Sequence, residues 1–307
     1  MTTSGIWAMG PTRVGIRLSL AFVLGIWTAA PQGAVFTDVL GRQVALDGEP
    51  KRIVTLAPSL TEIVYFLGLG DRVVGVTDFS SYPPEAKLKP KVGSYVNLNA
   101  EQIISLLPDL VIGTSDGNQP AVIELIDRAG IPVFIVNPSN TREVIETIRD
   151  IGRLCGVGDK ADALARDLSL RVDRIVAKTV GLDRPVVFLQ VSAKPIMTVN
   201  ASTFSSDLIR LAGGRNMADR EPITYPRISI EEVIREGPDV IIVSSMDRGG
   251  EFERVKQQWL SLEMIPAAKT GRVYLVDSDL IDRPSPRIVE GLEILAHHIH
   301  PDADWEH

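Results

Sequence analysis

A long amphipathic helix is predicted in the middle of the chain, within a helical segment at 139–181. Between 159 and 180, apolar residues recur at spacings of three and four, which places them on one stripe of an α-helix. The stripe consists of Ala161, Leu164, Ala165, Leu168, Val172, Ile175 and Val176. Asp159 is the predicted N-cap, and basic residues gather near the other end, where they complement the helix dipole. A helix of this length spans about 30 Å, enough to cross a small domain.

Short apolar runs alternate with amphipathic helices on both sides of this segment. On the N-terminal side, a hairpin at 35–46 precedes strands at 52–57, 73–77, 110–113 and 133–136 and helices at 59–67, 99–107 and 118–129. On the C-terminal side, the pattern predicts strands at 185–190, 196–199, 240–243 and 272–276 and helices at 205–212, 229–236 and 285–298. Such alternation is typical of parallel sheets with helices on both faces.

The predicted fold is therefore α/β, with two lobes that have mainly parallel central sheets flanked by helices and are joined by one long rigid helix. A length of 307 residues also favours two domains. The predicted parts are a signal peptide at 1–34, an N-terminal lobe at 35–138, the connecting segment at 139–181 with its backbone helix at about 159–180, a C-terminal lobe at 182–301 and a tail at 302–307.

One stretch recurs at an offset of 130 positions. Residues 99–112 match residues 229–242, with Glu101 opposite Glu231 and Pro108-Asp109 opposite Pro238-Asp239. Each copy reads as a capped helix, a Pro-Asp turn and a buried strand. Two unrelated α/β turns could share Pro-Asp, but the matched cap and glutamate favour a repeat that relates the two lobes.

The first 34 residues have the pattern of an export signal. Arg13 and Arg17 precede an apolar run at 18–27, which is followed by small residues. The run is short for a membrane span, although an uncleaved anchor is the alternative interpretation. Because no cysteine follows the run, we expect a cleavable signal peptide and no lipoprotein anchor.

Composition narrows the range of functions. A formal charge of −7 without a basic cluster argues against nucleic acid as a partner. The single cysteine, Cys155, is expected to be a buried apolar side chain, and the histidines His297, His298, His300 and His307 are expected to form a solvated tail. No nucleophile elbow, phosphate loop or metal set is present, so we expect neither an enzyme nor a resident cofactor or metal, and a two-lobed enzyme is the alternative from a different class.

The loops that follow the predicted strands have the side chains of a binding site. Ligands in parallel α/β sheets bind at the carboxyl ends of the strands, and these loops contain aromatic and charged residues in a chain with only 6% aromatics. Taken singly, each is explained by local packing. As a set they predict a cleft that stacks on a flat ligand and neutralises an acidic part of it. The candidate residues are Phe79, Tyr82, Tyr95, Asp116, Asn118, Lys194, Tyr225, Asp279 and Arg283.

With these residues, the chain resembles the helical-backbone periplasmic binding proteins of ABC importers, which capture cobalamin, haem and ferric siderophores. The resemblance covers about 36–301 and rests on the segments 36–44, 52–62, 108–112 and 285–288. It implies two lobes joined by a helix that permits small hinge motion, a location in the periplasm and a small-molecule metal-chelate ligand. It also implies a monomer that delivers this ligand to a permease dimer with its ATPase subunits.

The segments 82–85, 188–190 and 283–287 look most like the cobalamin-binding branch. In that branch a glutamate on each lobe meets arginines of the permease, which implies docking by Glu101 and Glu231. Phe79, Tyr95 and Tyr225 stand where the branch places aromatics against the corrin. The chain departs from the branch where aromatics are replaced, at Thr114, Val191 and Leu280. A corrinoid such as cobalamin is thus the expected ligand, and a ferric siderophore or haem is the alternative.

Overall fold

The computed structural model describes residue 1 and residues 33–244 and 251–305. The predicted signal peptide lies almost wholly outside the described residues. The compact unit is Gly33–His307, and the fold below is that of this unit. None of the described helices combines the length and the apolar character needed to cross a membrane.

The first half of this unit is a parallel sheet with a hairpin beside it. The hairpin pairs β1 (Ala34–Thr37) with β2 (Gln43–Leu46), as predicted. The sheet has the order β4-β3-β5-β6 and is parallel throughout. Its strands are β3 (Ile53–Thr55), β4 (Val73–Val76), β5 (Leu110–Thr114) and β6 (Val133–Val136). Its helices are α1 (Pro58–Phe66), α2 (Ala100–Ser105) and α3 (Pro120–Arg128), with short 3-10 turns at Gly70–Arg72 and Pro84–Leu88.

The second half repeats this order. Its sheet runs β10-β9-β7-β8, also parallel, so in both halves the first strand lies between the second and the third and the fourth lies outermost. The strands are β7 (Val186–Gln190), β8 (Arg215–Asn216), β9 (Val240–Val243) and β10 (Val273–Leu275). The helices are α6 (Phe204–Leu211), α7 (Ile230–Glu236), α8 (Glu251–Leu260), α9 (Pro266–Lys269), α10 (Ser278–Ile281) and α11 (Ile288–Ile299). The predicted α/β class is confirmed.

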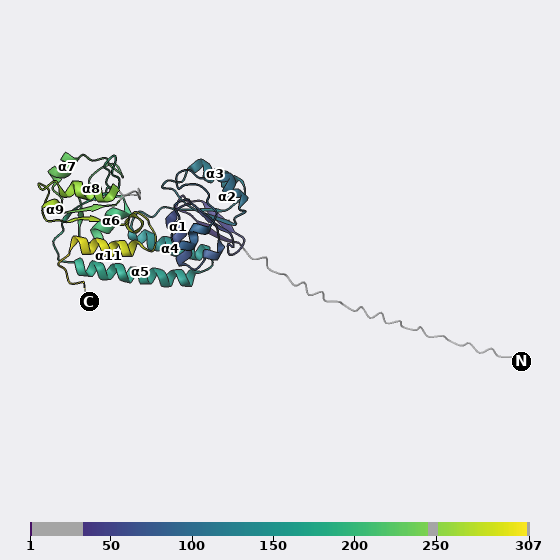
Figure 1. Cartoon of the computed structure of the whole chain (residues 1–307). Helices are drawn as coiled ribbons and strands as arrows, with labels where there is room; N and C mark the ends of the chain where they lie inside the picture. The colour runs from purple at the N-terminus through teal and green to yellow at the C-terminus, as the bar shows by residue number, and fades with distance from the viewer. Residues whose placement is uncertain (2–32, 245–250, 306–307) are drawn as a thin grey trace. The chain divides into compact units, whose positions relative to one another are not determined.

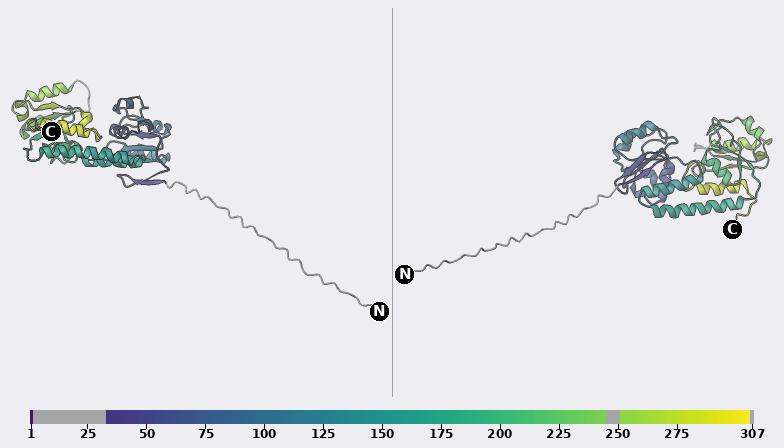
Figure 2. Two further views of the ribbon diagram at one scale, coloured as in Figure 1. Left: turned by 90° about the horizontal axis from the view of Figure 1, so that it is seen from below. Right: turned by 180° about the vertical axis from the view of Figure 1, so that it is seen from behind.

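Two helices connect the halves, α4 (Thr141–Leu154) and α5 (Gly158–Thr179). In Figures 1 and 2, α5 runs along both halves of the unit, and its 22 residues correspond to about 33 Å. Helix α4 packs against α1 on one side and α6 on the other, while α5 packs against α4, α6 and α11. The predicted cap is wrong, because Val157 occupies the N-cap and Asp159 lies in the first turn.

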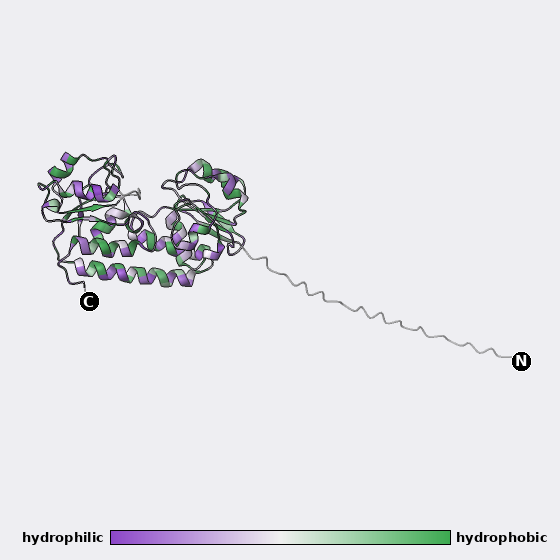
Figure 3. Cartoon of the chain, viewed as in Figure 1, coloured by the Kyte–Doolittle hydropathy of each residue, from purple (hydrophilic) through white to green (hydrophobic). Residues whose placement is uncertain are grey.

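The predicted stripe of α5 is its packing face. Ala161, Ala165, Leu168 and Ile175 are buried, while the opposite side is polar. Figure 3 shows this two-sided character, and the strands of both sheets are coloured as hydrophobic. A β-carbon on Gly152 of α4 would overlap the side chain of Ala161, so glycine is required where the two helices meet. One continuous apolar core therefore extends from both sheets to α4 and α5.

The residues matched by the sequence repeat have matched structural roles. The Asn99 side chain accepts a hydrogen bond from the Gln102 backbone and caps α2, as the Ser229 side chain does from Glu232 for α7. The carboxylate of Asp109 accepts hydrogen bonds from the backbone N–H groups of Lys51 and Arg52 before β3. Asp239 does the same for Val186 at the start of β7. These parallels favour the repeat over two unrelated turns.

Two sequence predictions about local structure are wrong. Residues 196–199 form no strand, because Met197 makes only single antiparallel bridges to Ser192 and Arg227. The described histidines do not form a solvated tail throughout either. His300 is buried and His298 stacks on Tyr274 with ring centroids 4.0 Å apart, whereas His297 is exposed with its ring 4.6 Å from that of Trp305. Packing against aromatic rings fixes the end of the chain, whereas His307 lies outside the described residues.

Candidate functional site

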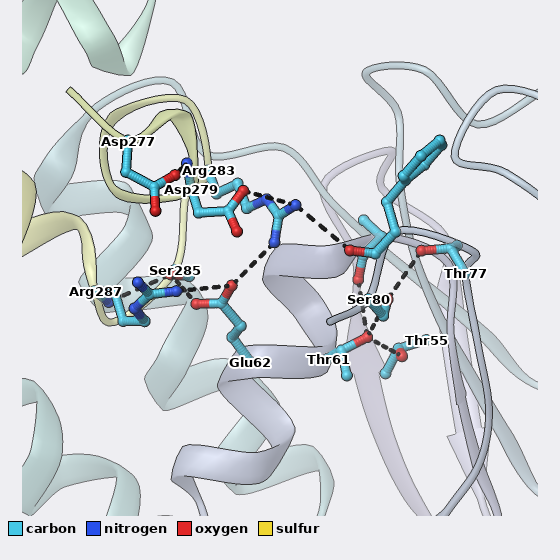
Figure 4. A network of polar contacts seen from close by, with 12 residues as sticks. Thr55, Thr61, Glu62, Thr77, Ser80, Asp277, Asp279, Arg283, Ser285 and Arg287 are labelled. Atoms are coloured by element: carbon cyan, nitrogen blue, oxygen red, sulfur yellow. Dashed lines mark hydrogen bonds and ion pairs between the residues drawn. The ribbon is translucent and has the colours of Figure 1, made fainter. Parts of the chain in front are cut away.

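The loops at the carboxyl ends of the two parallel sheets meet through a buried glutamate. Glu62 lies on α1, in the first turns after β3, and its side chain is fully buried. Its Oε2 accepts a hydrogen bond of 2.7 Å from the Ser285 hydroxyl, and its Oε1 lies 3.4 Å from Arg283 Nη1 and 3.8 Å from Arg287 Nη1. Figure 4 shows the three partners converging on Glu62 from the connection between α10 and α11. This cluster links the two halves directly.

Burial governs the ionisation of this carboxylate. Desolvation raises the pKa of Glu62 above its usual value, and the Ser285 hydrogen bond, Arg287 and Arg283 offset only part of the rise. The arginines have 15% and 13% of their side chains exposed, so both are also largely withdrawn from water. A buried charge needs such close partners to be tolerated.

The loop at 77–82 is attached to α1 by a chain of hydroxyl groups. The Thr61 hydroxyl contacts those of Thr55 at 2.7 Å and Ser80 at 2.9 Å, and Ser80 contacts Thr77 at 2.9 Å. Figure 4 shows this chain beside the Glu62 cluster. It fixes the loop that bears two of the predicted ligand residues, Phe79 and Tyr82.

Those two aromatic residues lie in different surroundings. Phe79 is 62% exposed, and its backbone oxygen accepts a 3.4 Å hydrogen bond from Arg283 Nη2. Tyr82 stacks on Phe66 with centroids 6.2 Å apart, and the Arg287 guanidinium lies 4.2 Å from its ring centroid. Phe79 is thus open to contact with a ligand, while Tyr82 belongs to the contact between the halves.

Two more predicted residues come together from opposite lobes. Tyr95 follows β4 and Tyr225 precedes α7. Each lies close enough to Asp116 for its charge to raise the pKa of the phenol. Burial raises the pKa of Tyr225 to about 12 and that of Tyr95 further, with smaller contributions from Asp116 and, for Tyr95, from Tyr225. Both phenols therefore keep their protons at neutral pH. Tyr225 is 40% exposed.

The acidic residues of the last loop surround Arg283. Asp279 Oδ1 lies 2.9 Å from Arg283 Nη2, and Asp279 is 7% exposed. The neighbouring Asp282 accepts a 2.7 Å hydrogen bond from the Ser244 hydroxyl, and burial raises its pKa to about 7. Sequence reasoning did not single out Asp282. This aspartate changes its charge near neutral pH, at the edge of the candidate site.

The structure places two predicted ligand residues in other roles. Asn118 is buried, and its side chain accepts a hydrogen bond from the Thr114 backbone and donates to the backbone oxygens of Leu56 and Tyr95. Its amide thus positions the loops from within. Lys194 is exposed, pairs with Glu251 at 3.2 Å and borders a pocket of about 360 Å³ beside α8 in the C-terminal lobe. Neither contacts the Glu62 cluster.

The predicted docking glutamates are both free of ion pairs within the described residues. Glu101 and Glu231 are exposed in the first turns of α2 and α7. In Figure 1, these helices lie on the side of each half that faces away from α5. Acidic groups in a first turn are also favoured by the helix dipole, which is a purely local explanation.

Three members of the central cluster were missed as site residues. Glu62, Ser285 and Arg287 lie in the segments 52–62 and 283–287 that support the family resemblance. The available signal was an ionisable residue in an apolar helix, since α1 is buried along most of its length. The described residues contain no group of three or more potential metal ligands among their His, Cys, Asp and Glu side chains.

Comparison with known proteins gives a consistent result. The model of the family described as periplasmic binding protein matches residues 53–280. An uncharacterized ABC transporter substrate-binding lipoprotein of Bacillus subtilis is 37% identical over 272 residues, covering 86% of this chain and 85% of that protein. The vitamin B12-binding protein of Vibrio parahaemolyticus is 31% identical over 258 residues, covering 83% and 92%.

Solved structures agree on the fold. The periplasmic vitamin B12 binding protein of Vibrio cholerae has a TM-score of 0.75 at 27% identity, covering 82% of this chain and 97% of that chain. The periplasmic heme-binding protein of Roseiflexus sp. RS-1 has a TM-score of 0.74 at 28% identity, covering 83% and 99%. Both support the arrangement of two α/β lobes.

One prediction is corrected by these comparisons. The leader suggested a periplasmic protein released by a cleavable signal peptide and without a lipoprotein cysteine, whereas the Bacillus subtilis relative is named a lipoprotein. Residues 2–32 lie outside the described residues, and Cys155, the sole cysteine in the sequence, is buried. The predicted localisation is therefore withdrawn.

The family match spans most of the two lobes, from β3 to α10, and the similar relatives are matched over most of their own length. Such proteins work with a membrane permease and its ATPase, and they carry a small-molecule ligand. The chain belongs to the periplasmic binding protein family and is a substrate-binding protein of an ABC transporter.

Proposed function

We propose that the protein binds a corrinoid such as cobalamin between its two lobes and presents it to the transporter. The single observation behind this proposal is that Tyr95 and Tyr225, one from each lobe, lie close enough for Tyr225 to raise the pKa of Tyr95, and both lie near Asp116. Phe79 is exposed, and the Arg283 guanidinium donates a hydrogen bond to its backbone oxygen. Aromatic faces stack on flat conjugated rings, and an arginine can pair with an acidic group such as a phosphate.

The similar proteins named for vitamin B12 support a corrinoid over other metal chelates. The chemistry of the two tyrosines points the same way. Their raised pKa values favour neutral phenols, which stack or donate hydrogen bonds, whereas an iron–tyrosinate bond requires the proton to be displaced. A corrinoid needs no such displacement.

Haem or a ferric siderophore is the second candidate ligand, because a heme-binding structure matches this fold at a TM-score of 0.74. In that case Tyr95 or Tyr225 would bind the iron or the chelate. A tyrosinate charge-transfer band on addition of the iron compound would favour this candidate. Its absence, together with binding of cobalamin, would favour the corrinoid.

Calorimetric titration of the full chain with cobalamin, haem and several ferric siderophores tests the proposal. We expect one cobalamin per chain with a Kd below about 10 µM, which corresponds to roughly −7 kcal/mol. A corrinoid affinity weaker than this would refute the proposed ligand. Binding of an iron compound alone would replace it with the second candidate.

We further propose that Glu101 and Glu231 dock the loaded protein on its permease. Their matched positions in the two halves and their lack of ion pairs among the described residues support this role. Exposed charges at equivalent positions of two related lobes fit a partner with two-fold symmetry, and they chiefly set the register and the rate of association.

A further inference from the structure

Two sequence segments that lie more than 200 positions apart meet at one carboxylate. Glu62 ends the segment 52–62, and its three partners all belong to the segment 283–287. The Ser285 side chain donates the shortest of these contacts, at 2.7 Å, and Ser285 is fully buried. Each contact that Glu62 makes in the cluster crosses from α1 in the N-terminal lobe to the C-terminal lobe.

The two arginines differ in what else holds them. Arg287 lies over the Tyr82 ring at 4.2 Å and within 3.9 Å of Glu290, so its other neighbours are an aromatic face and its own helix. Besides its contact with Glu62, Arg283 forms an ion pair of 2.9 Å with Asp279. It also donates a hydrogen bond to the backbone oxygen of Phe79, whose ring is exposed. Both arginines are therefore largely enclosed by protein, and Arg283 makes a second contact with the N-terminal lobe at the Phe79 backbone oxygen.

We propose that Glu62, Ser285, Arg283 and Arg287 form a joint that fixes the two lobes relative to each other. Glu62 is a positioning residue in this arrangement, because it holds the C-terminal loop against α1 without itself facing the ligand. The hinge of this protein would thus be set by a polar joint as well as by α5.

The joint can be tested on the ligand-free protein by measuring the distance between spin labels on the two lobes. Asp127→Cys in α3 and Lys269→Cys in α9 place one exposed label on each lobe. Cys155 is fully buried, and burial raises the pKa of its thiol to about 12, so it will not react with the label. The readout is the width of the inter-lobe distance distribution.

We expect Glu62→Gln, Arg283→Gln and Arg287→Gln to broaden this distribution and Ser285→Ala to broaden it less. Glu293→Gln is the matched control, since it breaks a 3.0 Å pair with Arg171 between α11 and α5 and leaves α1 untouched. It should lower the melting temperature without widening the distribution.

Any other set of distance distributions would overturn the proposal. Distributions as narrow as that of Glu293→Gln in all cluster variants would mean that the cluster does not fix the lobes. A distribution that stays narrow in both Arg283→Gln and Arg287→Gln would mean that the arginines do not hold the joint. If Glu62→Gln does not fold, Ser285→Ala and the two arginine variants still decide. No ligand is added, so a wrong choice of ligand class leaves the result intact.

Discussion

Asp282 gives the protein a pH-dependent stability that a single substitution should remove. Its pKa is raised from 3.8 to about 7, chiefly by burial, and the Ser244 hydroxyl donates a hydrogen bond to it. Because the folded-state pKa exceeds the unfolded one, the neutral acid stabilises the native state. This contribution is complete below about pH 4 and is lost as the pH rises through 7. At roughly 1.4 kcal/mol per pKa unit, the loss amounts to at most about 4 kcal/mol.

Asp282→Asn keeps the shape and an oxygen that can accept the Ser244 hydrogen bond, but it cannot ionise. We expect urea unfolding between pH 4 and 9 to show the variant gaining stability relative to the parent as the pH rises from about 4 to about 7, and no further gain above that. Asp302→Asn, at an exposed position, controls for the loss of one negative charge. A stability difference that does not change between pH 4 and 9 would refute the reasoning.

Three further predictions follow from the fold and the two proposals. Glu101→Lys combined with Glu231→Lys should abolish transport in a reconstituted uptake assay while ligand affinity is retained; unchanged uptake would exclude their docking role. Arg283→Gln should weaken calorimetric affinity for the ligand about tenfold or more, as expected for losing one well-placed charged contact, and unaltered affinity would show that the ligand does not use this arginine. Gly152→Val should lower the free energy of unfolding by about 1–3 kcal/mol through overpacking against α5, with partial rescue by Ala161→Gly; no loss of stability would mean that the two helices can separate freely.

Local patterns predicted the elements that bury a regular apolar face. Residues 133–136 and 240–243 are continuous apolar runs and are the strands β6 and β9 with the predicted bounds. The stripe of α5 was recognisable because buried residues recur at helical spacing. By contrast, only Val255 and Trp259 of α8 are buried, and two apolar positions are too few to predict an amphipathic helix from the sequence.

The contacts between distant segments could not be predicted in this way. The pairing of Glu62 with Arg283 joins residues 221 positions apart. Helical periodicity and strand alternation relate only residues that are close in sequence, so they do not predict such a contact. Tyr82 and Asn118 were grouped with Phe79 because all three follow strands. Their observed contacts are with Arg287, Phe66 and the backbone of neighbouring loops, which only the folded chain brings near.

That a flat ligand binds between the lobes is tested most directly by calorimetric titration of cobalamin into the parent protein and into Tyr95→Ala and Tyr225→Ala. Binding at a stoichiometry of one, weakened about tenfold or more by each substitution, is the predicted result, since buried aromatic contacts each contribute more than about 1 kcal/mol at such sites. His298→Ala, which removes a ring stacked on Tyr274 away from this space, should leave the affinity unchanged. Equal affinity in all four proteins would contradict binding between Tyr95 and Tyr225.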